Sequence, residues 1–125
     1  MAVRVLVVDD SMMIRQQMGR ALAEAGFAVT EAKDGVEALE QLAAVAEIGL
    51  IVCDFNMPRM NGIEFLQRLR SDGAVSGIPV LMLTTEGNRT YMHQAKQLGA
   101  KAWILKPFKS DLVIAAIKKI TSVAA

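Results

Sequence analysis

The chain has 125 residues, 53% of them hydrophobic, and a formal net charge of +1 at pH 7, so we expect one cytoplasmic domain over residues 1–125 with no output domain. The balanced charge argues against nucleic acid as a partner, and the single cysteine excludes a disulfide framework or a cysteine zinc cluster within the chain. No apolar stretch approaches the roughly 18 residues that span a bilayer, and the start lacks a secretory signal, so no membrane insertion is expected.

Short apolar runs alternate with amphipathic stretches five times along the chain. The first run spans residues 3–8, and the following helix should start at the N-cap Ser11 and end before Gly26. The inward face of this helix has apolar residues at helical spacing. They are Ile14, Met18, Ala21, Leu22 and Ala25.

A second, weaker strand is expected over residues 27–31. Asp34 and Glu37 have the spacing of a capping box, which predicts the start of a second helix. The apolar stripe of this helix consists of Val36, Leu39, Leu42 and Ala46. The third strand is the apolar run at residues 50–53.

The second half of the chain continues the alternation. Residues 56–62 form a loop rich in Asn, Pro and Gly, and Asn61 and Glu64 can cap a third helix that runs to about Arg70. A polar turn at residues 71–77 precedes the fourth strand at residues 80–83.

A fourth helix should follow residues 86–88, carry Tyr91, Ala95 and Leu98 on one side, and close at Gly99. The fifth strand spans residues 103–105. The last helix is expected from about residue 110 to residue 122.

Five strand–helix units in strict alternation indicate an α/β fold, a doubly wound parallel sheet with helices on both faces. Valine-rich runs without polar alternation fit strands that are buried on both sides. Cys53 adjoins Asp54 but should point to the opposite face of its strand, as a small buried hydrophobe. Ligands of such sheets bind in the crevice at the carboxyl ends of the strands, where the strand order reverses.

Polar side chains stand at or just past the ends of four of the apolar runs. Asp9 and Asp10 follow the first run, Asp54 the third, Thr84 the fourth and Lys106 the fifth. Since parallel strands bring their carboxyl ends to one edge, these residues should converge on one crevice. Three carboxylates, a hydroxyl and an ammonium there have the chemistry of a metal-assisted phosphoryl acceptor.

Electrostatics points to a cation at this crevice. Two carboxylates about 4 Å apart repel by roughly 4 kcal/mol at an effective dielectric constant of about 20, so three need a cation or shifted pKa values. Mg²⁺ is the candidate, because it prefers oxygen ligands. Asp54 is the best nucleophile, since it follows a buried strand and precedes a loop. The plain alternatives are a helix cap for Asp10, a turn residue for Asp54, a helix start for Thr84 and a surface lysine for Lys106.

Five segments together carry the motifs of a known family. They are Val-Leu-Val-Val-Asp9-Asp10-Ser11, Asp54-Phe-Asn-Met-Pro58, Met60-Asn61-Gly62, Pro79-Val-Leu-Met-Leu-Thr84 and Lys106-Pro107-Phe108. With them the chain resembles, over essentially its whole length, the receiver domain of bacterial two-component response regulators, and its layout is similar to that of the stand-alone chemotaxis regulators. The resemblance implies a flavodoxin-like (βα)5 fold with strand order 2-1-3-4-5.

The resemblance also implies roles for the acidic residues. Asp54 would accept a phosphoryl group from the phosphohistidine of a histidine kinase. The ligands of Mg²⁺ would be Asp10, the Asp54 carboxylate and the main-chain carbonyl of Asn56, with Asp9 acting through water.

In the family, Thr84 shifts toward the phosphoryl group, Lys106 bridges to it, and an aromatic residue of the fifth strand rotates inward. That rotation reshapes the face of the fourth helix, fifth strand and fifth helix, where a target protein docks. The aromatic residue is Trp103 here, where Tyr or Phe is more usual, and a surface-packed Trp is the alternative reading. Asn56 and Glu86 are similar to residues of the chemotaxis regulators and predict a phosphoryl group that lasts seconds to minutes.

The implied protein is a monomer that catalyses only its own phosphorylation and dephosphorylation. Its implied partners are a histidine kinase of the chemotaxis type, a target such as the flagellar switch, and a phosphatase. A receiver that passes the phosphoryl group to a histidine phosphotransferase, in motility or another pathway, has the same chemistry and stays open. An aspartyl-phosphate phosphatase usually has a general-acid aspartate where this chain has Asn56. A flavodoxin-like cofactor binder would need a phosphate loop where Asp9 and Asp10 stand.

Overall fold

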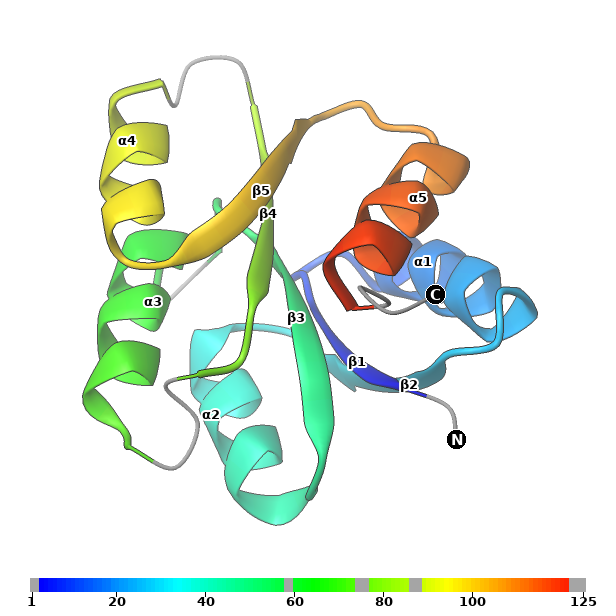
Figure 1. The fold of residues 1–125 in the computed structure, drawn as a ribbon, viewed down its shortest axis with the longest axis horizontal. Helices are drawn as coiled ribbons and strands as arrows, with labels where there is room; N and C mark the ends of the chain where they lie inside the picture. The colour runs from blue at the N-terminus through cyan, green and yellow to red at the C-terminus, as the bar shows by residue number, and fades with distance from the viewer. Residues whose placement is uncertain (1–2, 58–59, 74–76, 86–88, 122–125) are drawn as a thin grey trace.

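The computed structural model describes residues 3–57, 60–73, 77–85 and 89–121, and Glu86 lies outside these residues. Five strands alternate with five helices in the described chain (Figure 1). The strands are β1 (Arg4–Val8), β2 (Ala28–Ala32), β3 (Ile48–Asp54), β4 (Val80–Thr84) and β5 (Ala100–Leu105). The helices are α1 (Met12–Glu24), α2 (Gly35–Ala44), α3 (Gly62–Ser71), α4 (Arg89–Gln97) and α5 (Ser110–Thr121).

All strand pairs are parallel, and the sheet has the order β2-β1-β3-β4-β5. The predicted doubly wound fold and strand order are thus confirmed. Because β2 lies on one side of β1 and β3 on the other, the direction of winding reverses between β1 and β3. That point of reversal is the usual place for a ligand in such a sheet.

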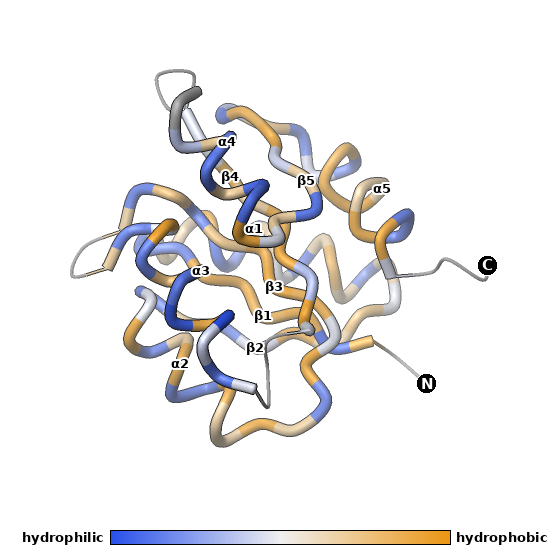
Figure 2. Tube along the Cα trace, turned by 60° about the vertical axis from the view of Figure 1, so that its left-hand side comes forward, coloured by the Kyte–Doolittle hydropathy of each residue, from blue (hydrophilic) through white to orange (hydrophobic). Residues whose placement is uncertain are grey.

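The sheet separates two helical layers, with α1 and α5 on one face and α2, α3 and α4 on the other (Figure 1). Each layer covers its own hydrophobic core cluster, built from alternate residues of the same strands. The tube in Figure 2 is hydrophobic along β1 and β3, whereas α3 and α4 mix hydrophilic and hydrophobic residues. No helix in the described part of the chain has the length and apolar character needed to cross a membrane.

The predicted helix caps are present. The Ser11 hydroxyl accepts a hydrogen bond from the Ile14 amide, so Ser11, not Asp10, is the N-cap of α1. Asn61 and Glu64 form a reciprocal capping box at α3. At α2, Asp34 accepts from the Glu37 amide.

The box at α2 differs from the prediction, because the Glu37 carboxylate accepts from the Lys33 amide, one residue before the cap. The predicted apolar stripe of α2 is also wrong at its last residue, Ala46. The helix ends at Ala44, the chain turns through a positive φ of 65° at Glu47, and Ala46 is exposed between them.

Several strand bounds extend beyond the apolar runs. β5 begins at Ala100, three residues before Trp103, because its main chain pairs with β4 from Val80 onward whatever side chains it carries. β3 likewise begins at Ile48 and pairs with β1 across an irregularity in register. β2 spans Ala28–Ala32, a shift of one residue from the expected range.

Candidate functional site

Three carboxylates meet at the point where the strand order reverses. Asp9 and Asp10 directly follow β1, and Asp54 is the last residue of the neighbouring strand β3. One carboxylate oxygen from each of the three lies within 4.8 Å of the other two. Asp9 and Asp54 are buried, with 1% and 2% of their surface exposed, whereas Asp10 is exposed.

An ammonium group enters the same crevice from the end of β5. The Lys106 amide donates to the Thr84 carbonyl at 2.8 Å, which keeps the chain beside β4 just past the strand. The Lys106 Nζ atom lies 3.0 Å from Oδ1 of Asp54 and 3.5 Å from Oδ2 of Asp9. This lysine therefore has two partners, unlike the unpaired surface lysine that was its plain alternative.

Local hydrogen bonds hold the two buried carboxylates in place. The Asp9 Oδ1 atom accepts from the Ser11 amide at 2.9 Å, and the Asp54 Oδ1 atom accepts from the Asn56 amide at 3.2 Å. The main chain is fixed as well, since the Phe55 amide donates to the carbonyl of Leu83 on β4 at 2.8 Å. Both carboxylates are thus placed by the loops that leave their strands.

Burial sets the electrostatics of the site. It raises the pKa of Asp54 above its ordinary value, the nearby Asp9 charge adds to this, and the hydrogen bond from Lys106 opposes it. Burial would lower the pKa of Lys106, but the hydrogen bond and charge of Asp54, helped by Asp9, leave that pKa raised. The ammonium is therefore charged at neutral pH and is the counter-ion of the cluster.

Thr84 and Trp103 lie on the neighbouring strands and share a cavity of about 10 Å³. Thr84 is buried, and its hydroxyl donates to the Thr85 carbonyl at 3.2 Å. Trp103 is half-buried and packs against the core cluster under α2, α3 and α4. The cavity is lined by Phe55, Met82, Thr84, Tyr91, Met92, Ala95 and Trp103.

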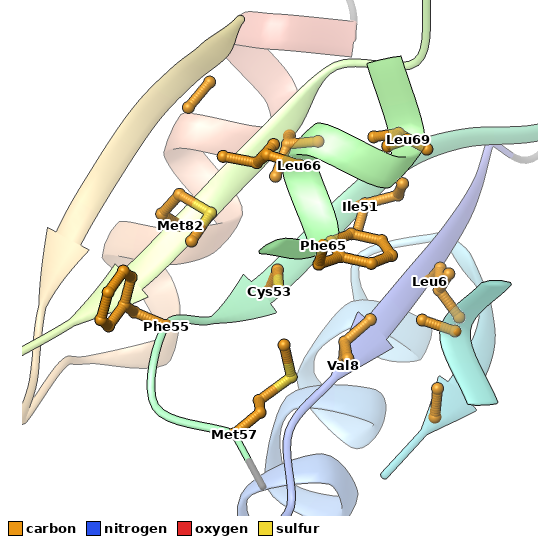
Figure 3. Packing of buried hydrophobic residues seen from close by; sticks show 14 of the residues in the cluster. Leu6, Val8, Ile51, Cys53, Phe55, Met57, Phe65, Leu66, Leu69 and Met82 are labelled. Carbon is orange, nitrogen blue, oxygen red and sulfur yellow. The ribbon is translucent and has the colours of Figure 1, made fainter. Parts of the chain in front are cut away.

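An aromatic contact joins the site to α4. Phe55, next to Asp54, lies at the end of β3 beside Met82 of β4 (Figure 3). Its ring centroid is 4.9 Å from that of Tyr91 on α4. Tyr91 is 45% exposed, and its contact with Phe55 was not predicted from the sequence, because it depends on how α4 packs across the sheet.

The structure therefore brings together Asp9, Asp10, Asp54 and Lys106, with Thr84 one strand away. The Asn56 side chain is exposed at the loop that follows β3. Cys53 is fully buried in the cluster under α2, α3 and α4 (Figure 3). Arg15, whose guanidinium contacts the loop after β1, was missed by sequence reasoning.

The donor set fits a hard divalent cation. Three carboxyl groups face a single ammonium, and all the metal-binding atoms that the acidic residues offer are oxygens. Carboxylate and carbonyl oxygens suit Mg²⁺, which usually binds through one or two carboxylates and keeps several waters. The exposed Asp10 carboxylate leaves the cluster accessible from solvent.

A five-stranded doubly wound sheet with acidic residues and a lysine at its carboxyl edge defines a class of signalling domains. The chain matches the family model described as response regulator receiver domain over residues 5–118, and it belongs to that family. It is 40% identical over 111 residues to chemotaxis protein CheY1 of Helicobacter pylori, covering 88% of this chain and 90% of that protein. It is 36% identical over 118 residues to chemotaxis protein CheY of Pseudomonas aeruginosa, covering 94% of each.

Solved structures agree with these matches. Chemotaxis protein CheY4 of Vibrio cholerae superposes with a TM-score of 0.89 at 36% identity, covering 96% of this chain and 99% of that one. The chain is thus a CheY-like receiver domain of two-component signalling.

Proposed function

We propose that this chain is a phosphorylation-controlled switch in which Asp54 accepts a phosphoryl group from the phosphohistidine of a histidine kinase. The observation that carries the proposal is the convergence of three carboxylates and Lys106 at one crevice, with the Lys106 Nζ atom 3.0 Å from Asp54. Membership in the receiver family supports it independently.

Mg²⁺ is the cofactor that these residues would hold. Its ligands would be the carboxylates of Asp10 and Asp54 and the main-chain carbonyl of Asn56, with Asp9 acting through water. When bound, Mg²⁺ neutralises charge on the transferring phosphoryl oxygens and orients the group.

In the transfer, a carboxylate oxygen of Asp54 attacks phosphorus. The phosphorus–nitrogen bond to the donor imidazole breaks, and its electron pair returns to that nitrogen, which is then protonated. The product is an acyl phosphate on Asp54. Lys106 is already paired with Asp54, so its ammonium can follow the new negative charge to a phosphoryl oxygen.

The switch would act through Thr84 and Trp103. The Thr84 hydroxyl would turn from the Thr85 carbonyl to the phosphoryl group, which opens the shared cavity to inward movement of Trp103. A phosphoryl group adds one to three charge-assisted hydrogen bonds of about 1.5–3 kcal/mol each. Together they can supply the roughly 5.5 kcal/mol that moves a two-state equilibrium from 1:99 to 99:1.

The readout would be a target protein that docks on the face of α4, β5 and α5. We propose a monomeric receiver in the cytoplasm that acts by docking to this target. The relatives that are named chemotaxis proteins and match over at least 90% of their length support a role in motility, with a kinase, a flagellar target and a phosphatase as partners.

The proposal is tested with phosphoramidate, a small donor that has the same phosphorus–nitrogen bond. With Mg²⁺, intact-protein mass spectrometry should show one added phosphoryl group on the wild type and none on Asp54→Ala. Asp111→Asn, which changes an exposed carboxylate on α5, is the matched control and should be labelled like the wild type. Full labelling of Asp54→Ala, or of the wild type in EDTA, would overturn the proposal.

A further inference from the structure

The position of Asp10 depends on a loop rather than on a strand. Asp10 lies between the end of β1 at Val8 and the start of α1 at Met12. Within the described residues, its carboxylate has no hydrogen bond or ion pair, in contrast to those of Asp9 and Asp54. The conformation of the main chain at Asp9 and Asp10 must therefore decide where this carboxylate points.

Arg15 of α1 fixes that main chain. Its Nη1 atom donates to the Asp9 carbonyl at 2.6 Å, and its Nε atom pairs with Oε1 of Glu31 on β2 at 3.2 Å. The guanidinium thus links the loop to the neighbouring strand. The Asp9 amide donates to the Ala32 carbonyl of the same strand at 3.1 Å, so both sides of Asp9 are tied to β2.

The arginine end of the link is largely shielded from solvent, whereas the Glu31 side chain is 45% exposed. Only 14% of the Arg15 side chain is exposed, and a planar guanidinium holds two acceptors in one fixed geometry. Since Glu31 neutralises its charge, Arg15 adds little net field to the acidic cluster. Its effect on the site should therefore come from geometry.

We propose that Arg15 is a positioning residue for divalent cation binding, acting through the carbonyl of Asp9 to hold the Asp10 carboxylate beside Asp54. This inference rests on the proposed function, because it assigns a residue that organises the same metal site. Arg15 touches neither the acceptor nor a phosphoryl donor. Its loss should weaken cation binding while the chemistry at a saturating cation concentration is preserved.

The test is a calorimetric titration of the whole chain with Mg²⁺. The main variant is the double substitution Arg15→Gln with Glu31→Gln, which removes the link without changing the net charge. We expect about tenfold weaker Mg²⁺ binding, the lower end of the range for residues that orient metal ligands. The rate of labelling by phosphoramidate should fall at low Mg²⁺ and recover at saturating Mg²⁺.

Two further variants complete the design. Arg20→Gln removes an exposed arginine of the same helix and should bind Mg²⁺ like the wild type. Arg15→Lys keeps the charge but cannot hold both acceptors, so its affinity should lie between those of the wild type and the double variant. If the double variant does not fold, Arg15→Lys carries the test with the same direction.

Wild-type affinity in the double variant and in Arg15→Lys would overturn the inference and leave the proposed function standing. A labelling rate that stays low at saturating Mg²⁺ would also overturn it, because the loss would then not be one of binding. Failure of the wild type to bind Mg²⁺ would instead overturn the proposed function itself.

Discussion

The substitution Asp54→Asn should stabilise the protein when no divalent cation is present. At an effective dielectric constant of about 20, repulsion between Asp9 and Asp54, whose oxygens lie within 4.8 Å, costs at least about 3.5 kcal/mol, and attraction to Lys106 across 3.0 Å contributes about 5.5 kcal/mol. The remaining attraction is at most about 2 kcal/mol, and repulsion by the nearby Asp10 reduces it further. It is therefore smaller than the burial penalty of an ion, which is several kcal/mol. We therefore expect Asp54→Asn to raise the free energy of unfolding by about 1–2 kcal/mol.

The increase in the free energy of unfolding by Asp54→Asn should depend on pH. Because burial raises the pKa of Asp54 in the folded protein above its ordinary value of 3.8, the folded state binds more protons than the unfolded state between these two pKa values. The free energy of unfolding of the wild type should therefore fall, relative to that of Asp54→Asn, as pH rises through this window. The gain should be absent below about pH 3.8 and should grow as pH rises through the raised pKa of Asp54.

Urea unfolding in EDTA at pH 7 and at low pH measures the stabilisation by Asp54→Asn and its dependence on pH. Lys106→Met is the matched opposite variant, since it leaves two buried carboxylates without their counter-ion and should lose about 3–5 kcal/mol. Adding Mg²⁺ at 100 times its dissociation constant should stabilise the wild type by about 2.7 kcal/mol, and Asp54→Asn by less. An Asp54→Asn variant no more stable than the wild type in EDTA at pH 7 would refute the reasoning.

Three further outcomes are expected. Cys53 should resist alkylation by iodoacetamide in the folded protein and react on unfolding, because burial, with the nearby carboxylates, raises the pKa of its thiol. Rapid modification of the native protein, seen by mass spectrometry, would contradict this expectation. Thr84→Ala should still be labelled at Asp54 but lose most of the change in Trp103 fluorescence on phosphorylation. An undiminished change would show that the movement of Trp103 does not depend on the Thr84 hydroxyl. The phosphoryl group should last seconds to minutes, as expected from Asn56 and Glu86, and a decay over many hours after removal of the donor would show otherwise.

The sheet and the main acidic site could be predicted because both follow from local patterns. Apolar runs mark the strands, and a polar residue at the end of each run must lie at the carboxyl edge once the strands are parallel. That reasoning reaches Asp9, Asp10, Asp54 and Lys106, and the structure places these four side chains in one crevice.

What could not be predicted depends on packing between distant elements. Tyr91 contacts Phe55 only because α4 packs against β5 and α3, and Arg15 reaches the Asp9 carbonyl only because α1 packs beside β2. The early start of β5 at Ala100 has a related cause, since pairing with β4 recruits residues with little strand preference of their own.

The claim that Asp54 is the acceptor is tested most directly by locating the phosphoryl group. The protein is labelled with phosphoramidate and Mg²⁺, treated with borohydride, which reduces an acyl phosphate to an alcohol, and mapped by peptide mass spectrometry. Borohydride should reduce the side chain of Asp54 and of no other aspartate. Reduction at Asp9 or Asp10 with Asp54 intact would contradict this claim.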